Sequence, residues 1–153
     1  MINLSIIVQV DSRENKNCEV INYFEKIGQK YFVSKVAGAD YINFKSPKVA
    51  IDLKGGLLEL CNNLTWEHER FKREMDLVKN SMECDMVILI REPLKSLEDV
   101  KNWKSKRTQV QGEQLYKIMK TMQERYNLMY IFCTREEAGA KILEIIKWYE
   151  DNL

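Results

Sequence analysis

Six short runs of apolar and β-branched residues, separated by segments of helical periodicity, constrain the fold of this chain more than any other feature. The runs are LSIIVQV, YFVSKV, DYINF, KVAIDL, DMVILI and LMYIFC, and their length and composition are typical of β-strands. Apolar residues in most intervening segments recur at every third or fourth position, as in helices that pack one face on a core. The last helix is predicted to begin at Thr134, where Glu137 would complete a capping box. This alternation predicts an α/β fold with a single mixed β-sheet flanked by helices on both faces.

The length of the chain limits how many such sheets it can form. A chain of 153 residues is about the size of one domain, so residues 1–153 are expected to form a single domain. The N-terminal run INLSIIVQV is too short to span a bilayer and lacks the basic leader and cleavage site of a secretion signal. We therefore expect a cytoplasmic protein that does not bind a membrane.

The cysteines and the histidine argue against two kinds of site. The four cysteines are far apart and form no CxxC pair, and His68 is the only histidine, so the usual ligand spacing of zinc sites is missing. A lone histidine in the polar stretch WEHERFKRE also makes a Ser-His-Asp or Cys-His site a poor interpretation. Four reduced and mostly buried thiols are expected instead.

The charge of the chain is nearly balanced. The formal net charge is +1, so binding to nucleic acid would have to come from a local basic patch or from a partner. Lys104, Lys106 and Arg107 crowd together in WKSKRTQVQ, between two helical patterns. These three residues are therefore candidates for contact with DNA phosphates, although an ordinary solvated loop has the same composition.

The stretch VAIDLKGG, residues 49–56, places two charged residues in an otherwise apolar strand. Residues two apart share one face of a strand, so Asp52 and Lys54 point away from the apolar set around Ile51. The preceding strand begins with Asp40, across the turn KSPK. A three-residue loop at 46–48 would set Asp40 opposite Lys54, on the face of Asp52. A two-residue Ser-Pro loop would send Asp40 to the other face, but Ser-Pro suits such a turn poorly.

Two carboxylates and a lysine at a strand end are typical of a site for a hard divalent cation. Asp40 and Asp52 would supply the oxygen ligands that Mg²⁺ prefers. The cation would polarise a phosphodiester, while Lys54 would neutralise charge in the transition state. The alternative is a surface salt bridge between Asp52 and Lys54, which would contribute little and need no function.

Several further motifs occur in the order of one nuclease family. VDSRE follows the first strand, GADY opens the strand of Asp40, IDLK ends the next strand, and ERFKREM lies on the helix beyond. YIFCTREEAGAKILEII is similar to the closing strand and helix of that family. Over nearly its whole length the chain resembles the XPF-type nuclease domain of the PD-(D/E)xK superfamily. This resemblance implies a restriction-endonuclease-like fold.

The resemblance also implies roles for individual residues. The implied catalytic residues are Asp11, Glu14, Asp40, Asp52 and Lys54, of which Asp40 and Asp52 are the metal ligands. Arg13 and Arg70 are the implied DNA contacts beside the site. Each motif also has a purely structural explanation, such as Asp11 as a helix cap or Arg70 with Glu74 as an i,i+4 surface pair.

The sequence departs from the family pattern at a few positions. Ala39 separates Gly38 from Asp40, Asp52 is shorter than glutamate, Leu53 replaces the central arginine, Glu59 lies one place beyond the expected acidic residue, and Glu74 replaces a glutamine. A shorter ligand can move a metal. The leucine removes a possible phosphate or structural contact.

The function implied by the resemblance is a Mg²⁺- or Mn²⁺-dependent DNA endonuclease. Its substrate would be branched DNA, a flap, fork or junction, in repair or recombination, and it would form a homodimer or heterodimer through the nuclease domain. Family members usually add helix-hairpin-helix motifs, which we do not expect here. The competing interpretation is a catalytically inactive nuclease-fold subunit that binds DNA or acts as a scaffold. A small nucleotide-binding protein is a third, but G-x-G-x-x-G and G-x-x-x-x-G-K-[ST] are missing.

Overall fold

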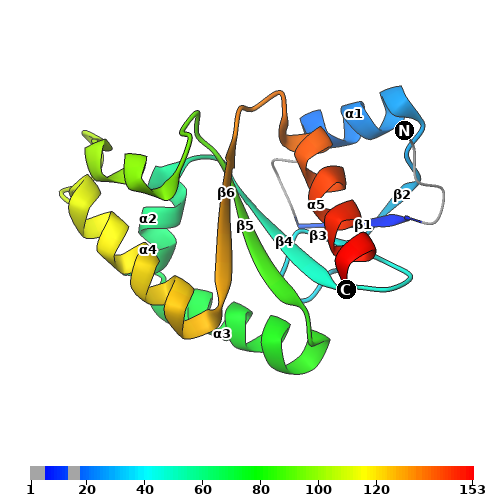
Figure 1. Ribbon diagram of the computed structural model, residues 1–153, viewed down its shortest axis with the longest axis horizontal. Coiled ribbons are helices and arrows are strands. Elements are labelled where there is room, and N and C mark those ends of the chain that lie inside the picture. The colour runs from blue at the N-terminus through cyan, green and yellow to red at the C-terminus, as the bar shows by residue number, and fades with distance from the viewer. Residues whose placement is uncertain (1–5, 14–17) are drawn as a thin grey trace.

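A six-stranded sheet lies at the centre of the computed structural model, which describes residues 6–13 and 18–153 (Figure 1). Its strands are β1 (Val8–Asp11), β2 (Tyr31–Ser34), β3 (Tyr41–Asn43), β4 (Val49–Lys54), β5 (Asp85–Arg91) and β6 (Leu128–Cys133). The α-helices are α1 (Cys18–Ile27), α2 (Leu57–Thr65), α3 (His68–Leu77), α4 (Gly112–Tyr126) and α5 (Ala138–Asn152). A π-helical turn, η1 (Val78–Met82), extends α3, and a 3-10 helix, η2 (Leu97–Asn102), precedes α4. Each of the six apolar runs therefore contains a strand.

The sheet is mixed, in the order β2-β1-β3-β4-β5-β6. β3 pairs antiparallel with β1 and with β4, whereas the outer neighbours pair in parallel. Helices α2, α3 and α4 cover one face and α1 and α5 cover the other (Figure 1). This arrangement confirms the predicted α/β class.

The two faces of β4 belong to different cores, as its alternating pattern predicts. Val49, Ile51 and Leu53 pack with α1 and α5. Ala50 packs with α2, α3 and α4. Asp52 follows Ala50 on that second face and is buried there together with Lys54. The pair therefore lies beneath α2 and α3.

The register between β3 and β4 differs from the prediction by two residues. Tyr41 lies opposite Ile51, which places Asp40 level with Asp52 rather than with Lys54. The connection is longer than the predicted loop and spans residues 44–48, because other strands hold its two ends. The Phe44 N–H donates to the Ile7 carbonyl, and the Lys48 carbonyl accepts from the Asp85 N–H. A shift of two residues preserves the face, so Asp40 and Asp52 still share one side of the sheet.

The start of the last helix also differs from the prediction. Glu137 does reach back, and its carboxylate accepts the Thr134 N–H at 2.9 Å. However, Thr134 opens a turn rather than the helix, and α5 begins at Ala138. Hydrogen bonds from the backbone and the side chain of Thr134 lower the pKa of Glu137 below 4.5. The predicted capping residues thus stabilise the turn before α5.

Two further expectations concern burial and membranes. Cys61, Cys84 and Cys133 are buried free thiols, as expected, whereas Cys18 is exposed. Among residues 6–13 and 18–153, none of the helices combines the length and the apolar character that a membrane span requires.

Candidate active site

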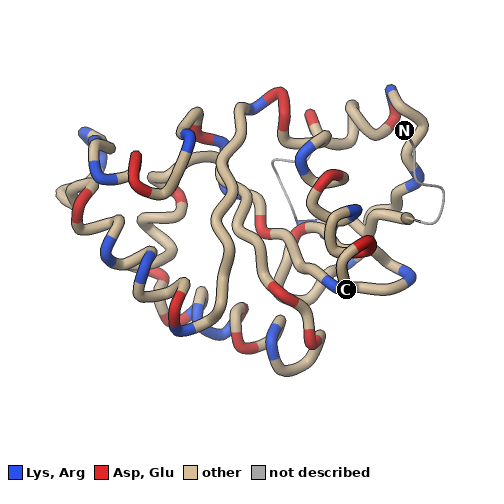
Figure 2. The backbone as a smooth tube through the Cα atoms, in the orientation of Figure 1, with Lys and Arg blue, Asp and Glu red and all other residues tan. Residues whose placement is uncertain are grey.

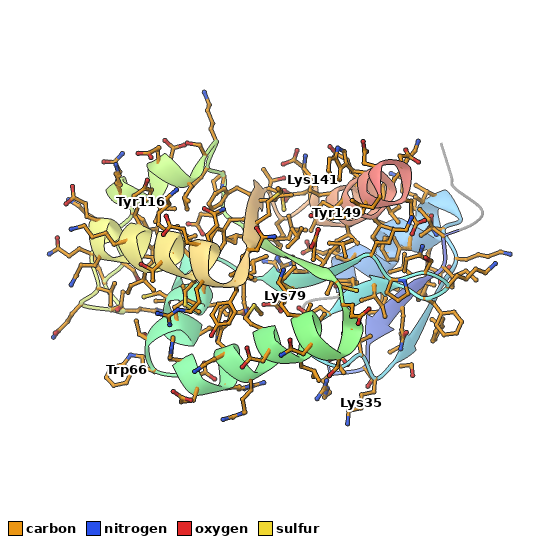
Figure 3. All side chains as sticks on the ribbon, turned by 60° about the horizontal axis from the view of Figure 1, so that its bottom comes forward. Lys35, Trp66, Lys79, Tyr116, Lys141 and Tyr149 are labelled. Atoms are coloured by element: carbon orange, nitrogen blue, oxygen red, sulfur yellow. The ribbon has the colours of Figure 1, made fainter. Side chains whose placement is uncertain are left out.

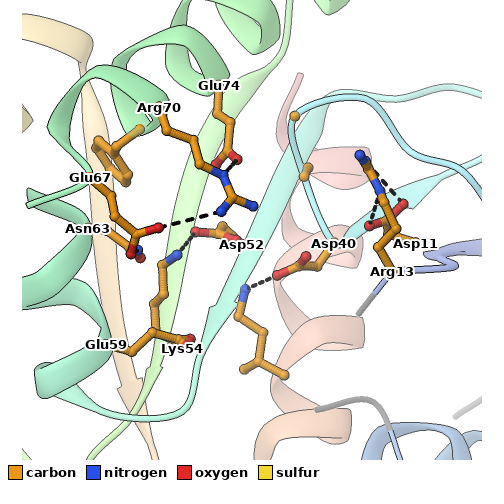
Figure 4. Close-up of a pocket in the computed structure, with 14 residues that line it drawn as sticks. Asp11, Arg13, Asp40, Asp52, Lys54, Glu59, Asn63, Glu67, Arg70 and Glu74 are labelled. Atoms are coloured by element: carbon orange, nitrogen blue, oxygen red, sulfur yellow. Dashed lines mark hydrogen bonds and ion pairs between the residues drawn. The ribbon is translucent and has the colours of Figure 1, made fainter. Parts of the chain in front are cut away.

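A pocket of about 360 Å³ opens beside the end of β4, between the start of β3 and the helices α2 and α3 (Figure 4). Its lining is mainly charged. The lining residues are Asp11, Arg13, Gly38, Ala39, Asp40, Asp52, Leu53, Lys54, Glu59, Asn63, Glu67, Arg70, Phe71 and Glu74. The pocket therefore brings together every site residue predicted from the four motifs except Glu14, which lies outside the described residues.

Asp52 and Lys54 form a buried ion pair at the base of this pocket. Lys54 Nζ lies 2.8 Å from Asp52 Oδ2, and the two side chains are only 9% and 10% exposed. This burial excludes the alternative of a surface salt bridge. Apart from this ammonium, Asp52 Oδ2 has no hydrogen-bond partner among the residues that the structure describes, so its remaining lone pair can accept a further ligand.

The charge state of Lys54 follows from two opposing effects. Burial lowers the pKa of Lys54, but the charge of Asp52, its contact with the ammonium, and the charges of Glu59 and Asp40 together raise it above 10.5. The lysine is therefore protonated at neutral pH. It places one positive charge among the carboxylates of the pocket.

Asp40 lies where three strands meet. Its backbone N–H donates to the Ile51 carbonyl, and its carbonyl accepts from the Asp11 N–H at 2.8 Å. Its Oδ2 accepts the Leu53 N–H at 2.8 Å. These contacts fix the carboxylate at the edge of the pocket, level with Asp52.

Leu53 contributes its backbone to the pocket and its side chain to the opposite core. Its side chain is buried among residues that face α1 and α5, and its N–H binds Asp40. The replacement of arginine at this position therefore removes no side chain that points into the pocket. The predicted loss of a phosphate contact at Leu53 is not supported by this geometry.

Asp11 is buried and already engaged by the protein. Its Oδ1 accepts the Val36 N–H at 2.9 Å, and its Oδ2 lies 3.3 Å from Nε of Arg13. Arg13 also donates to the Val36 carbonyl at 2.9 Å. Asp11 therefore positions Arg13 and the segment that leads to β3.

The wall formed by α2 and α3 contains Asn63 and Glu67, which sequence reasoning missed, and Glu59, which it noted only as a displaced acidic residue of the family pattern. Glu59, Asn63 and Glu67 follow one another at intervals of four residues, and the Asn63 amide donates to Glu67 at 3.1 Å. The predicted residue Arg70 lies 3.4 Å from both Glu67 and Glu74. A usable signal was the polar i,i+4 spacing beside the apolar stripe of α2. However, only the packing of α2 on the sheet decides whether these polar residues face the pocket or solvent.

Glu74 is a half-buried carboxyl in the same wall. Burial, followed by the negative charge of Asp52, raises its pKa above 4.5, and the charges of Lys54 and Arg70 oppose that shift. The expected i,i+4 contact with Arg70 is present. Because Asp52 and Lys54 both influence it, Glu74 belongs electrostatically to the pocket as well as to the surface of α3.

The charge of the pocket favours a cation. Its lining holds six carboxylates and three basic side chains, an excess of three negative charges. No three His, Cys, Asp or Glu side chains of residues 6–13 and 18–153 form a complete metal cage. Mg²⁺, however, is usually bound through one or two carboxylates, with waters and substrate phosphates completing its shell. Asp40 and Asp52, the latter with a buried oxygen in contact with the Lys54 ammonium, fit that mode of binding.

The glycine pair after β4 does not form a phosphate site. The Glu92 carboxylate accepts the Leu57 N–H at 3.2 Å, and Glu59 accepts the Gly55 N–H at 3.3 Å. A Cβ at Gly56 would lie 3.0 Å from the Glu92 carboxylate, so this carboxylate packs closely against the glycine. The protein's own carboxylates thus occupy the N-terminus of α2, which argues against a nucleotide phosphate at this position.

The basic segment with Lys104, Lys106 and Arg107 lies apart from the pocket. These side chains are exposed and are not part of the pocket lining. Trp103 and Val110 pack on the core at either end of the segment. Figure 2 shows basic and acidic positions interspersed along the rest of the chain.

Comparison with known proteins supports the same fold. The family model of the ERCC4 domain matches residues 10–146. The structure of XPF from Aeropyrum pernix aligns with a TM-score of 0.70 and 16% identity, over 93% of this chain and 60% of that one. XPF from Aeropyrum pernix in complex with DNA aligns with a TM-score of 0.69 and 14% identity, over 95% and 66%. This chain thus spans less than two thirds of those proteins, and such identities show the fold alone. No curated protein sequence matches.

Proposed function

The chain belongs to the ERCC4 domain family, and on that premise we propose that it is a metal-dependent DNA endonuclease that cleaves branched DNA at a flap, fork or junction. The observation that carries the proposal is the buried Asp52–Lys54 pair beside Asp40 in an acidic pocket. A buried charged pair is costly to maintain, and its position in a pocket is typical of catalytic groups.

Asp40 and Asp52 would hold Mg²⁺ or Mn²⁺. A divalent cation held by these carboxylates supplies positive charge that polarises a phosphodiester and makes water easier to deprotonate. Lys54 adds a second positive charge that stabilises the negative charge developing on the phosphoryl oxygens. Asp11 orients Arg13, and Arg13 and Arg70 are exposed at the rim, where each guanidinium can bind a DNA phosphate.

The substrate and the assembly are part of the same proposal. One of the similar structures is XPF in complex with DNA, which supports DNA as the substrate of this chain. With a net charge of +1, a single copy attracts DNA only weakly. We therefore propose a homodimer or heterodimer formed through the nuclease domain, which would double the number of phosphate contacts. Cellular roles in repair or recombination, in the cytoplasm, complete the proposal.

A catalytically inactive subunit is the second candidate. It is favoured by one observation, that Lys54 already neutralises Asp52 while both oxygens of Asp11 are engaged. Such a subunit would bind branched DNA and position a partner without cleaving.

Calorimetry with Mg²⁺ and Mn²⁺, combined with a cleavage assay, separates these candidates. The substrates are single-stranded, duplex, flap, fork and four-way DNAs of matched sequence. An endonuclease cleaves one or more of the branched DNAs only when the cation is present. Binding of branched DNA without metal binding or cleavage would instead establish the inactive subunit.

A further inference from the structure

Trp66 is an unusually exposed tryptophan in the turn between α2 and α3, directly before Glu67, which lines the pocket. Its side chain is 87% exposed, the largest value among the large apolar residues that the structure describes. Figure 3 shows it projecting outward from the turn between α2 and α3. Tryptophan contributes most to stability when it is buried, so this position gives the fold little. An exposed aromatic ring instead suits contact with a ligand.

The helix α3, which follows the turn of Trp66, has three exposed residues on one flank. Successive residues of a helix are rotated by about 100°, so Arg70, Arg73 and Leu77 lie on one flank of α3. All three are exposed, and Arg70 also lines the pocket. We call Trp66, Arg70, Arg73 and Leu77 the α3 rim.

The composition of the α3 rim distinguishes among possible ligands. It offers one aromatic ring and two guanidinium groups, whereas Leu77, 37% exposed, is its only other apolar side chain. A protein interface would require a larger apolar centre. Surfaces that bind single-stranded nucleic acid combine an aromatic ring, on which a base stacks, with basic groups that contact the backbone. The rim matches this chemistry.

We propose that the α3 rim binds an unpaired nucleotide of the DNA whose phosphodiester enters the pocket, with its base stacked on Trp66. Arg73 contacts the phosphate of that nucleotide. This inference rests on the proposed function and gives it a source of specificity. A blunt duplex has no unpaired base to offer, whereas a flap or fork has one beside the duplex.

The test compares the affinity of variants for a fork and for a duplex. The probes are a fork with one single-stranded thymidine arm and a blunt duplex of the same base-paired sequence, with Ca²⁺ in place of Mg²⁺ so that binding is measured without turnover. Trp66→Ala is expected to weaken fork binding by about tenfold, since stacking of one base contributes on this scale. It should leave duplex binding unchanged. Trp66→Phe should retain most of the fork affinity.

Two controls make the result specific. Trp148→Ala removes another exposed tryptophan, 54% exposed and packed on Tyr149 of α5, and should change neither affinity. Arg73→Ala should weaken fork binding and reduce its salt dependence by about one phosphate contact. Sedimentation should show that Trp66→Ala has the same oligomeric state as the unmodified protein.

The outcomes that overturn this inference differ from those that overturn the proposed function. Stacking at Trp66 would be overturned if Trp66→Ala lost fork and duplex affinity equally or lost neither. It would also be overturned if this variant had a different oligomeric state. Cleavage of branched DNA by the unmodified protein would persist in all these cases. If the unmodified protein binds no DNA, both proposals are wrong.

Discussion

At the scale of single residues, the burial of Asp52 and Lys54 has the largest consequences. A pair at the surface would contribute about 1 kcal/mol or less, and its loss would leave the fold intact. The observed pair is about nine-tenths buried, so removal of one partner leaves an isolated charge in a medium of low polarity. Substitutions at these positions should therefore affect stability as well as activity.

Asp52→Asn should lower metal affinity and cleavage together, by about a hundredfold or more, because the amide lacks the anionic oxygen that a hard cation requires. It should also lower the free energy of unfolding by about 3 kcal/mol or less, since Asp40 and Glu59 still interact with the Lys54 charge. Calorimetry and urea denaturation measure the two effects. Asp76→Asn, on the exposed side of α3, is the matched control. A variant that cleaves at the unmodified rate would place the site elsewhere.

Lys54→Ala should separate metal binding from chemistry. Removal of a positive charge beside Asp52 should preserve or strengthen metal binding, whereas the chemical step should slow by about a hundredfold. Single-turnover cleavage at saturating metal measures that step. Exposed Lys72 on α3 provides the control substitution to alanine. Parallel loss of metal affinity in Lys54→Ala would contradict the role proposed for the lysine.

Glu74→Gln should change the dependence of stability on pH. Since burial raises the pKa of Glu74 above 4.5 in the folded protein, that state retains the proton longer than the unfolded chain does. The unmodified protein therefore loses stability as the pH rises from 4.5 through the raised pKa. The free energy of unfolding of the glutamine variant, relative to that of the unmodified protein, should therefore be higher at about pH 7 than at about pH 4. Urea denaturation at both pH values tests this prediction. If the two proteins differ in stability by the same amount at both pH values, Glu74 does not titrate in this way.

At the scale of elements, contact between the β2–β3 connection and α3 shapes the pocket. Gly38 has a φ of +75°, and a Cβ there would lie 3.1 Å from Val78 and 3.2 Å from the Glu74 carbonyl. The glycine allows the segment that carries Asp40 to approach the helix that carries Arg70 and Glu74. The width of the pocket is thus set by a residue without a side chain.

Gly38→Ala should destabilise the protein by about 1–3 kcal/mol, because alanine is strained at this φ. The new methyl group should also push α3 outward and lower cleavage activity per folded molecule. Gly28→Ala is the matched control, since Gly28 has the same φ of 75° but does not line the pocket. Equal activities of the two variants, corrected for the folded fraction, would show that the contact with α3 does not position the site.

At the scale of the whole molecule, the balanced charge limits how DNA can be attracted. Basic and acidic positions alternate along most of the chain, and the segment of Lys104, Lys106 and Arg107 is an exception (Figure 2). That segment lies outside the pocket, so it can act on a remote part of a DNA substrate. Its contribution would be to affinity rather than to the chemical step.

Removal of Lys104, Lys106 and Arg107 together should weaken DNA binding and flatten its dependence on salt, because each phosphate contact contributes to the slope. Cleavage at saturating DNA should be unchanged. Affinity measured between about 50 and 200 mM salt gives the slope. If the slope is unchanged, the segment is an ordinary solvated loop.

Patterns along the sequence were sufficient to predict the six strands and the faces of the side chains on β4. Alternation in VAIDLKGG placed Asp52 and Lys54 on one side of β4, because successive residues of a strand point to opposite faces. The same alternation kept Asp40 on that side despite the wrong register. Motif order also led to the family, which the family model confirms.

Only the tertiary structure decided burial, register and the far wall of the pocket. The ends of the β3–β4 connection are held by Ile7, directly before β1, and by Asp85 of β5. These contacts join residues distant in the sequence, so no local turn preference predicts them. Glu59 and Asn63 of α2, and Glu67 in the turn after it, line the pocket because of how α2 packs on the sheet. Burial of the Asp52–Lys54 pair likewise requires helices that lie later in the chain. Such properties depend on long-range packing, whereas periodicity along a chain describes only one element at a time.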